Sequence, residues 1–104
     1  MHDYLRSWPI VNGSATQKDY VNATGTVYVV NGVGGAIDTD SFDGYPEKDW
    51  EAFRDDYAGC KPHCRRGFGR IIVDNATHLT YQQFTVVNLT HGDRELIDEF
   101  VISR

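Results

Sequence analysis

The sequence predicts an α+β fold, mostly β-strand with one amphipathic helix. Short runs of β-branched and aromatic residues, bounded by turn residues, predict strands at Val27–Val30 and in the last third of the chain. The spacing of Trp50, Phe53 and Tyr57 places one apolar stripe on a short helix. Hydrophobic residues make up 40% and aromatic residues 12% of the 104, which is enough for a modest core and too much for disorder.

The first strong strand signal is Val27–Val30. This stretch has almost no polar alternation, so we expect a central strand buried on both faces. It ends at the glycine-rich segment 31–35. Such a segment can cradle a phosphate, but no helix-opening pattern comes after it, and neither GxGxxG nor a Lys-Ser/Thr pair is present. We therefore interpret it as a tight turn that lets another segment pack closely.

The helix is expected over 46–57. Pro46 suits the first turn of a helix, and Glu47 and Asp49 follow it near the positive end of the helix dipole. The last third of the chain is expected to be a three-stranded antiparallel meander over 70–73, 78–86 and 96–102. Asp74-Asn75 and His91–Asp93 are the turns between these strands.

Charge and hydropathy exclude two classes of partner. The net charge of −5 argues against nucleic acid, because binding to phosphates requires a basic face. No apolar run reaches the roughly 18 residues that a membrane span requires.

Glycosylation sequons are in excess. Four of the five asparagines open an N-x-[S/T] triplet, at Asn12, Asn22, Asn75 and Asn88. The 12 Ser and Thr residues would give about 0.6 sequons by chance, so the excess favours a secreted glycoprotein. The alternative is that these residues only mark turns.

Met1 is followed by His2-Asp3-Tyr4, without the basic and apolar regions of a signal peptide. A chain with secretory features and no leader is expected to be a fragment of a longer protein.

Cys60 and Cys64 are the two cysteines of the chain, with His63 between them. In an oxidising compartment they favour one disulfide across a short loop. A zinc site is the weaker alternative because the spacing is wrong and a fourth ligand is not evident. Pairing with cysteines of a longer protein stays open.

Several segments, in order, resemble the C-terminal end of a purple acid phosphatase of the metallophosphoesterase superfamily, with fungal members the most similar. The residues His2, Tyr4 and Arg6 keep the H-x-Y-x-R spacing of the last metal motif of the family, and Trp8-Pro9-Ile10 matches the aromatic-Pro pair that the family often has a few residues later. The strand and glycine turn over 27–35, the hairpin over 67–81 and the final strand Asp98–Ile102 also resemble the family. One departure is Leu5, where the family usually has Glu; this puts the charge network around Arg6 in doubt.

The resemblance implies that residues 1–104 are the C-terminal share of an αββα sandwich, with the rest of the catalytic domain missing upstream. It implies a parent that hydrolyses phosphate monoesters with Fe(III) and a divalent Zn, Mn or Fe ion, which activate water. His2 would be one iron ligand of seven, so the chain alone is expected to hold no metal and to be inactive. The alternative is a stand-alone secreted β-rich module that binds or supports other molecules without catalysis.

Overall fold

The computed structural model describes residues 4–34, 46–55, 66–88 and 90–104. Its strands are Tyr4–Ser7 (β1), Ile10–Val11 (β2), Ser14–Ala15 (β3), Val29–Asn31 (β4), Glu51–Arg54 (β5), Arg66–Asn75 (β6), His78–Asn88 (β7) and Asp93–Ser103 (β8). They form three small antiparallel sheets, and none of the described residues is helical. A search of those same residues for a helix able to cross a membrane found none.

The first sheet, sheet A, has the strand order β4-β1-β5. In its register Leu5 lies opposite both Val30 on β4 and Arg54 on β5, and Arg6 lies opposite Phe53. β1 is therefore the central strand of this sheet.

The second sheet is the β2–β3 hairpin, closed by Asn12-Gly13. Both turn residues have positive φ, 50° and 79°, which is the geometry of a type I′ turn. Asn-Gly is the residue pair that adopts this turn most readily, so the local sequence accounts for the hairpin.

The third sheet, sheet C, has the order β6-β7-β8, which confirms the expected meander. Its strands are longer than predicted, at 10 or 11 residues each, because the pairing continues past the β-branched runs. Arg66 pairs with Val86 at one end, and Asn75 pairs with His78 at the hairpin turn.

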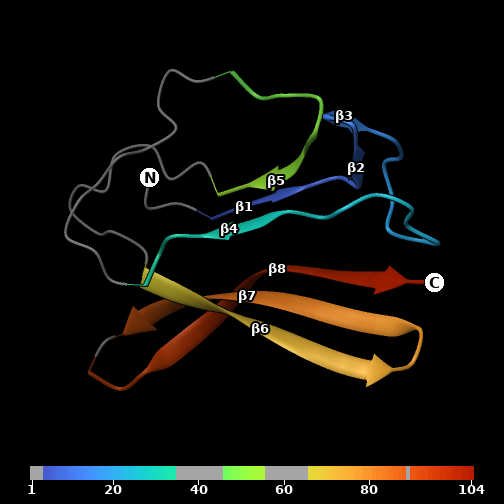
Figure 1. Cartoon of the computed structure of the whole chain (residues 1–104). Helices are drawn as coiled ribbons and strands as arrows, with labels where there is room; N and C mark the ends of the chain where they lie inside the picture. The colour runs from blue at the N-terminus through green and yellow to red at the C-terminus, as the bar shows by residue number, and fades with distance from the viewer. Residues whose placement is uncertain (1–3, 35–45, 56–65, 89) are drawn as a thin grey trace.

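Sheets A and C lie face to face (Figure 1). Aromatic side chains from both sheets and from the loop after β3 form the core, which consists of Tyr4, Tyr20, Tyr81 and Phe100. Tyr4 and Tyr81 stack across the two sheets with ring centroids 6.1 Å apart, and Tyr20 lies 4.9 Å from Phe100. The core is thus a layer of rings rather than of aliphatic side chains.

The α+β prediction is wrong: the regular structure of the described residues is all-β, and part of the expected helix is strand β5. Isolated helices of about 12 residues are marginal, and the free edge of β1 offers backbone partners to this segment. As a strand, β5 places Phe53 opposite Arg6, and the Phe53 ring lies 5.8 Å from that of Tyr4. The predicted αββα layers have no helix in the described residues, and Tyr57 lies outside them.

The prediction of a central, doubly buried strand at Val27–Val30 is also wrong. β4 covers Val29–Asn31 and lies at one edge of sheet A, with β1 as its partner. Val29 and Val30 are 37% and 42% exposed. Continuous apolar sequence reports the preference for a strand but not the position of the strand in a sheet.

The described part of the glycine-rich segment comes directly after β4 and contacts the first residues of β6. The Gly67 amide donates to the Val33 carbonyl at 2.9 Å, so this segment joins the edges of the two sheets. Gly35 lies outside the described residues.

Gly69 on β6 leaves room for the Tyr81 ring of the neighbouring strand and for Asn31 of sheet A. A Cβ atom at this position would lie 2.6 Å from Tyr81 Cζ and 2.9 Å from Asn31 Nδ2. The Tyr81 ring is buried and cannot move aside, so only glycine fits here.

We expect Gly69→Ala to destabilise the fold by about 1–3 kcal/mol, the usual cost of overpacking. Urea unfolding measures this free energy. Gly34→Ala is the control, because a Cβ atom at Gly34 would meet nothing within 4 Å. Equal stability of the two variants would contradict the close approach.

Candidate functional site

The structure does not place the predicted metal ligand or the predicted disulfide. His2, Cys60 and Cys64 all lie outside the described residues. Their assignments therefore stay predictions. The described residue nearest to His2 in sequence is Tyr4, which begins β1.

The four sequons lie in or beside turns. Asn12 is in the β2–β3 turn, and Asn22 has a positive φ of 50° in the loop that precedes β4. Asn75 ends β6, and its Oδ1 accepts hydrogen bonds from the Thr77 amide and hydroxyl, both at 2.9 Å. Asn88 ends β7 and is half-buried, whereas the other three asparagines are exposed.

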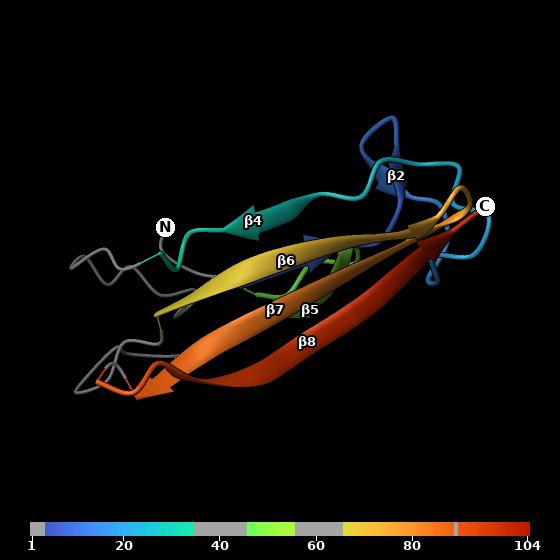
Figure 2. The same ribbon diagram turned by 90° about the horizontal axis from the view of Figure 1, so that it is seen from below.

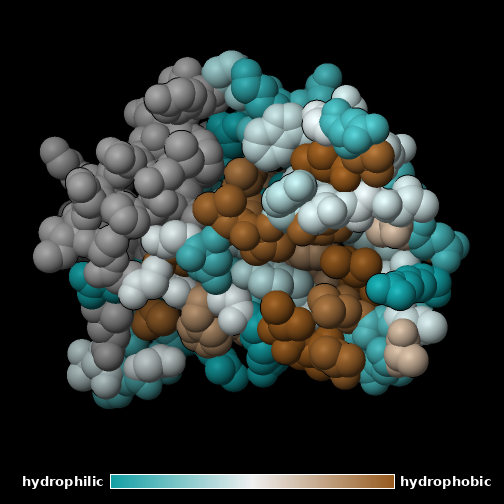
Figure 3. Space-filling view, in the orientation of Figure 1, coloured by the Kyte–Doolittle hydropathy of each residue, from teal (hydrophilic) through white to brown (hydrophobic). Residues whose placement is uncertain are grey.

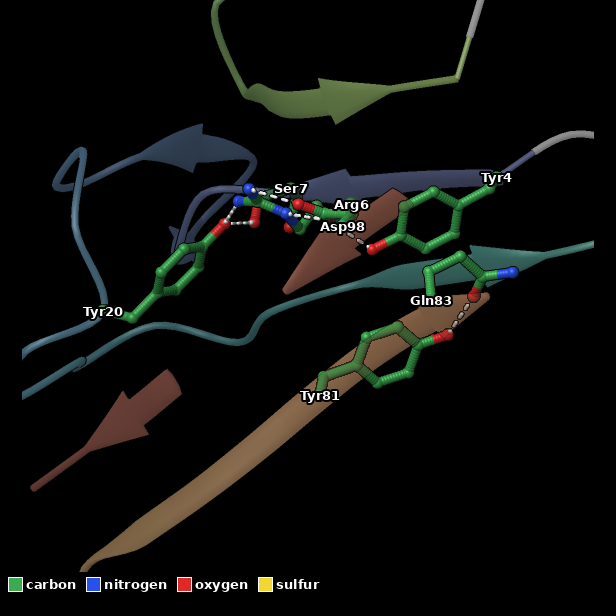
Figure 4. Close-up of polar contacts among 7 residues, drawn as sticks. All are labelled: Tyr4, Arg6, Ser7, Tyr20, Tyr81, Gln83 and Asp98. Atoms are coloured by element: carbon green, nitrogen blue, oxygen red, sulfur yellow. Dashed lines mark hydrogen bonds and ion pairs between the residues drawn. The ribbon is translucent and has the colours of Figure 1, made fainter. Parts of the chain in front are cut away.

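A buried ion pair joins β1 to β8 between the sheets (Figure 4). Arg6 donates from Nε to Asp98 Oδ2 at 2.6 Å and from Nη2 to Asp98 Oδ1 at 3.1 Å, a two-pronged contact. The side chains of Arg6 and Asp98 are 12% and 7% exposed. The Tyr4 hydroxyl donates to the same Oδ2 atom at 2.6 Å. One carboxylate thus holds two residues of β1.

Tyr20 completes the surroundings of the Arg6 guanidinium. Arg6 Nη1 donates to the Tyr20 hydroxyl, which in turn donates to the Ser7 carbonyl at 3.0 Å. The guanidinium carbon also lies 4.8 Å from the centroid of Phe100 and 5.7 Å from that of Phe53. Rings above a desolvated guanidinium attract it through their quadrupole. The Arg6 guanidinium is therefore stabilised both by hydrogen bonds to oxygen atoms and by contacts with aromatic rings.

A second, smaller polar cluster lies between β4 and β7. The Tyr81 hydroxyl donates to Gln83 Oε1 at 2.8 Å and accepts from Asn31 Nδ2 at 3.3 Å. Gln83 Nε2 donates to Asn31 Oδ1 at 3.4 Å. Gln83 is fully buried, and these bonds satisfy its amide.

Burial shifts the acid–base properties of this layer. Desolvation raises the pKa of Tyr4 far above its usual value, and the hydrogen bond to Asp98 raises it further. Desolvation also raises the pKa of Tyr20 and Tyr81. For Arg6, burial lowers the pKa, but the hydrogen bond and charge of Asp98 outweigh it, so the net direction is upward. The tyrosines stay neutral and the arginine stays charged.

The expected weakness at Leu5 is not seen. Arg6 takes its carboxylate from β8 rather than from its sequence neighbour. Leu5 itself is buried and lines a pocket of about 410 Å³ with Ile10, Gly13, Tyr28, Val30 and Trp50. An apolar residue suits this position because it lies opposite Val30.

Asp98 and Tyr20 are the residues whose role the sequence did not reveal. Asp98 belongs to the final strand that resembles the family, but its partner Arg6 is 92 positions away, and no local pattern links them. The alternation of Asp98 with Phe100 was the available signal, because a charge on the core face of a strand needs a partner.

The described residues do not form a metal centre. They contain no group of three or more His, Cys, Asp or Glu side chains that could hold a metal ion. The hydrogen-bond donors of the network bind other residues of the protein. The raised pKa values of Tyr4 and Tyr20 keep both hydroxyls protonated near neutral pH, which does not suit proton transfer. The network has a structural role: it fixes β1, the strand that comes after His2 in sequence, against β8.

We expect Asp98→Asn to lower the free energy of unfolding by about 3–5 kcal/mol, because it leaves a buried guanidinium without a counter-charge. Urea unfolding at neutral pH measures the loss. Glu95→Gln on the same strand is the control: it makes the same chemical change at an exposed side chain and should alter stability by under about 0.5 kcal/mol. A loss for Asp98→Asn no larger than that of the control would disprove the central role of the pair.

Stability should fall at alkaline pH. The folded-state pKa of Tyr4 is raised, so its stabilising contribution is complete below the unfolded value of about 10 and is lost as pH rises above it. Unfolding in urea at pH 8 and pH 10.5 measures the slope. Tyr4→Phe should flatten it, and Tyr28→Phe, at a residue 56% exposed, is the control. Parallel slopes for the parent and Tyr4→Phe would refute the assignment.

Comparison with known proteins identifies the relationship. Residues 25–99 match the family model described as iron/zinc purple acid phosphatase-like protein C. Searches of curated proteins and of solved structures found no significant match. The matched region begins at Gly25, in the loop before β4, includes the Arg6-binding residue Asp98, and covers more than half of the chain. The chain therefore belongs to the purple acid phosphatase-like family as a C-terminal segment.

Proposed function

We propose that this chain is the C-terminal part of a secreted acid phosphatase that hydrolyses phosphate monoesters at a centre of ferric iron and a divalent metal. The observation that carries the proposal is the family match over residues 25–99. The H-x-Y-x-R spacing of His2, Tyr4 and Arg6, just before the matched region, supports it. His2 is the one iron ligand that this chain would contribute.

The chain alone is proposed to be inactive. Of the seven metal ligands that the resemblance implies, His2 is the one with a match in this sequence, and one histidine cannot hold two metals. The catalytic contribution of this segment is then to place His2. Arg6 and Tyr4, both bound to Asp98, support this by holding the strand that comes after it.

The partner proposed for this segment is the remaining catalytic domain, and one side of the structure suits such a contact. Side chains that are apolar gather over β4 and over the C-terminal half of β6 (Figure 3). Ile71 and Val73 are 64% and 75% exposed although they lie opposite Tyr81 and Leu79 on the face of sheet C that turns toward sheet A. The strands of sheet A have three or four residues and do not cover the whole of this face. We call this surface, with Tyr28, the open side.

Both edge strands on the open side have one described neighbour: β4 pairs with β1, and β6 pairs with β7. Unpaired strand edges next to exposed apolar side chains favour association with another strand or sheet. The open side therefore supports a segment that works as part of a larger domain.

Secretion rests on the sequons. Asn12, Asn22 and Asn75 are exposed and lie in or beside turns, so their side chains are accessible for glycan attachment. Asn88 is half-buried, and its Oδ1 accepts hydrogen bonds from the Thr90 and His91 amides. We propose glycans at the first three sites and at Asn88, with the lowest occupancy at Asn88.

The first test is the intact mass of the native protein that carries this sequence, before and after enzymatic deglycosylation. We expect a deglycosylated mass several times the 11.8 kDa of this chain, and a glycan mass removed by the treatment. A native protein of 11.8 kDa would overturn the phosphatase proposal in favour of a stand-alone module. An unchanged mass on deglycosylation would overturn the glycan assignment.

The second test measures the rate of hydrolysis of p-nitrophenyl phosphate at pH 5, for the native protein and for the 104-residue chain. The native protein is expected to turn over the substrate, and the chain alone is expected to show no rate above the uncatalysed reaction. His2→Ala in the native protein should lower the iron content measured by atomic absorption. Full iron content in that variant would remove His2 from the ligand set.

A further inference from the structure

The outer face of sheet C carries an unusual combination of arginine and phenylalanine. Seen from below, this face of β6–β8 has no described strand in front of it (Figure 2). The register places on it one residue set, which we call the arginine–phenylalanine face: Arg66, Phe68, Arg70, Phe84, Arg94 and Leu96. The face points away from the aromatic core and from the network of Arg6.

The centre of this face is apolar, and its side chains pack against one another. Phe68 and Phe84 stack with ring centroids 5.3 Å apart. The guanidinium carbons of Arg70 and Arg94 lie 5.3 Å and 5.0 Å from the centroid of Phe84. Phe84 is buried by this packing, whereas Phe68 and Leu96 are 40% and 46% exposed. The face thus presents an exposed apolar strip flanked by guanidinium groups.

The arginines of this face have no carboxylate partner among the described residues, where the ion pairs are Arg6–Asp98 and Arg54–Glu51. Arg70 donates to the neutral Gln82 Oε1, at 3.0 Å from Nε. Two carboxylates of the same face are engaged by neutral partners. Glu99 lies in the cross-strand row of Arg70 and accepts from Gln82, and Asp74, near the hairpin turn, accepts from Thr80. Three positive charges thus lie around the apolar strip, with Glu99 beside Arg70, in a chain of net charge −5.

The register also gives the spacing of these charges. Arg66 and Arg94 lie opposite Val86 from its two sides, so they are two strand spacings apart, about 10 Å. Arg66 and Arg70 are four residues apart on β6, about 13 Å. The apolar strip of Phe68 and Leu96 lies between these positions.

We propose that the arginine–phenylalanine face is a docking surface for an acidic polypeptide segment, with carboxylates on either side of one or two apolar residues. In an extended segment, side chains three or four residues apart are separated by about 10–13 Å, which matches the arginine spacing. Guanidinium groups bind carboxylates through paired hydrogen bonds, and stacking on Phe84 orients two of them in advance. The exposed strip takes the apolar residue of the segment. This surface is separate from the open side, and the inference does not rest on the phosphatase proposal.

The test uses the 104-residue chain and a fluorescein-labelled decapeptide with two glutamates on each side of a central Leu-Phe pair. Fluorescence anisotropy at low and at physiological salt measures the affinity. We expect binding that weakens as salt rises, and no binding of a peptide with glutamine in place of every glutamate. Arg66→Gln should weaken binding about threefold, as should Arg94→Gln, in line with single exposed charge pairs.

Arg66→Gln is the decisive variant because Arg66 has no ring contact with Phe84, so its loss should leave the fold intact; urea unfolding checks this. Arg104→Gln, which removes an arginine outside the face, is the control and should bind as the parent does. Unchanged affinity in Arg66→Gln, or equal binding of the glutamine peptide, would overturn the proposal. Tighter binding of polyphosphate than of the acidic peptide would assign the face to polyanions instead, and self-association abolished by Arg66→Gln would assign it to a second copy.

Discussion

The ion pair of Arg6 and Asp98 is the interaction on which the rest of the structure depends. It joins the first described strand to the last one, across 92 positions of sequence and between two sheets that share no backbone ladder. Removing two charges from water is costly, and the cost is offset only where every donor and lone pair is satisfied. Here Tyr4 and Tyr20 supply further bonds, so that each nitrogen of the guanidinium and both oxygens of the carboxylate have a hydrogen-bond partner.

The same pair explains why the core is aromatic. A guanidinium between two sheets needs neighbours that exclude water and still attract a positive charge, and ring faces do both. Phe53, Tyr20 and Phe100 surround Arg6 from three different segments of the chain. Tyr81 extends the layer by stacking on Tyr4, and Gly69 leaves room for its hydroxyl. The large rings, the glycine at position 69 and the buried charge therefore depend on one another in the packing of the core.

The range of each interaction decides whether the sequence could predict it. The β6–β7–β8 meander and the Asn12-Gly13 hairpin were predictable because turn residues and β-branched runs act within a few positions. The helix over 46–57 was wrong because its apolar spacing expresses a local preference, which pairing with the distant edge of β1 overrides. The position of β4 at an edge, and Asp98 as the partner of Arg6, depend on contacts that no local pattern encodes.

The dependence of β1 on β8 gives a physical reason for the two ends of the family pattern to occur together. Strand β1 has four residues and pairs with β4 and β5, but no backbone ladder ties it to sheet C. Asp98 fixes Tyr4 and Arg6 at their side chains, which sets both the direction and the depth of the strand. In the proposed phosphatase, a displacement of β8 would therefore displace β1, the strand that follows His2 in sequence. The C-terminal strand, to which the resemblance assigns no metal ligand, would then influence the metal centre through the placement of β1.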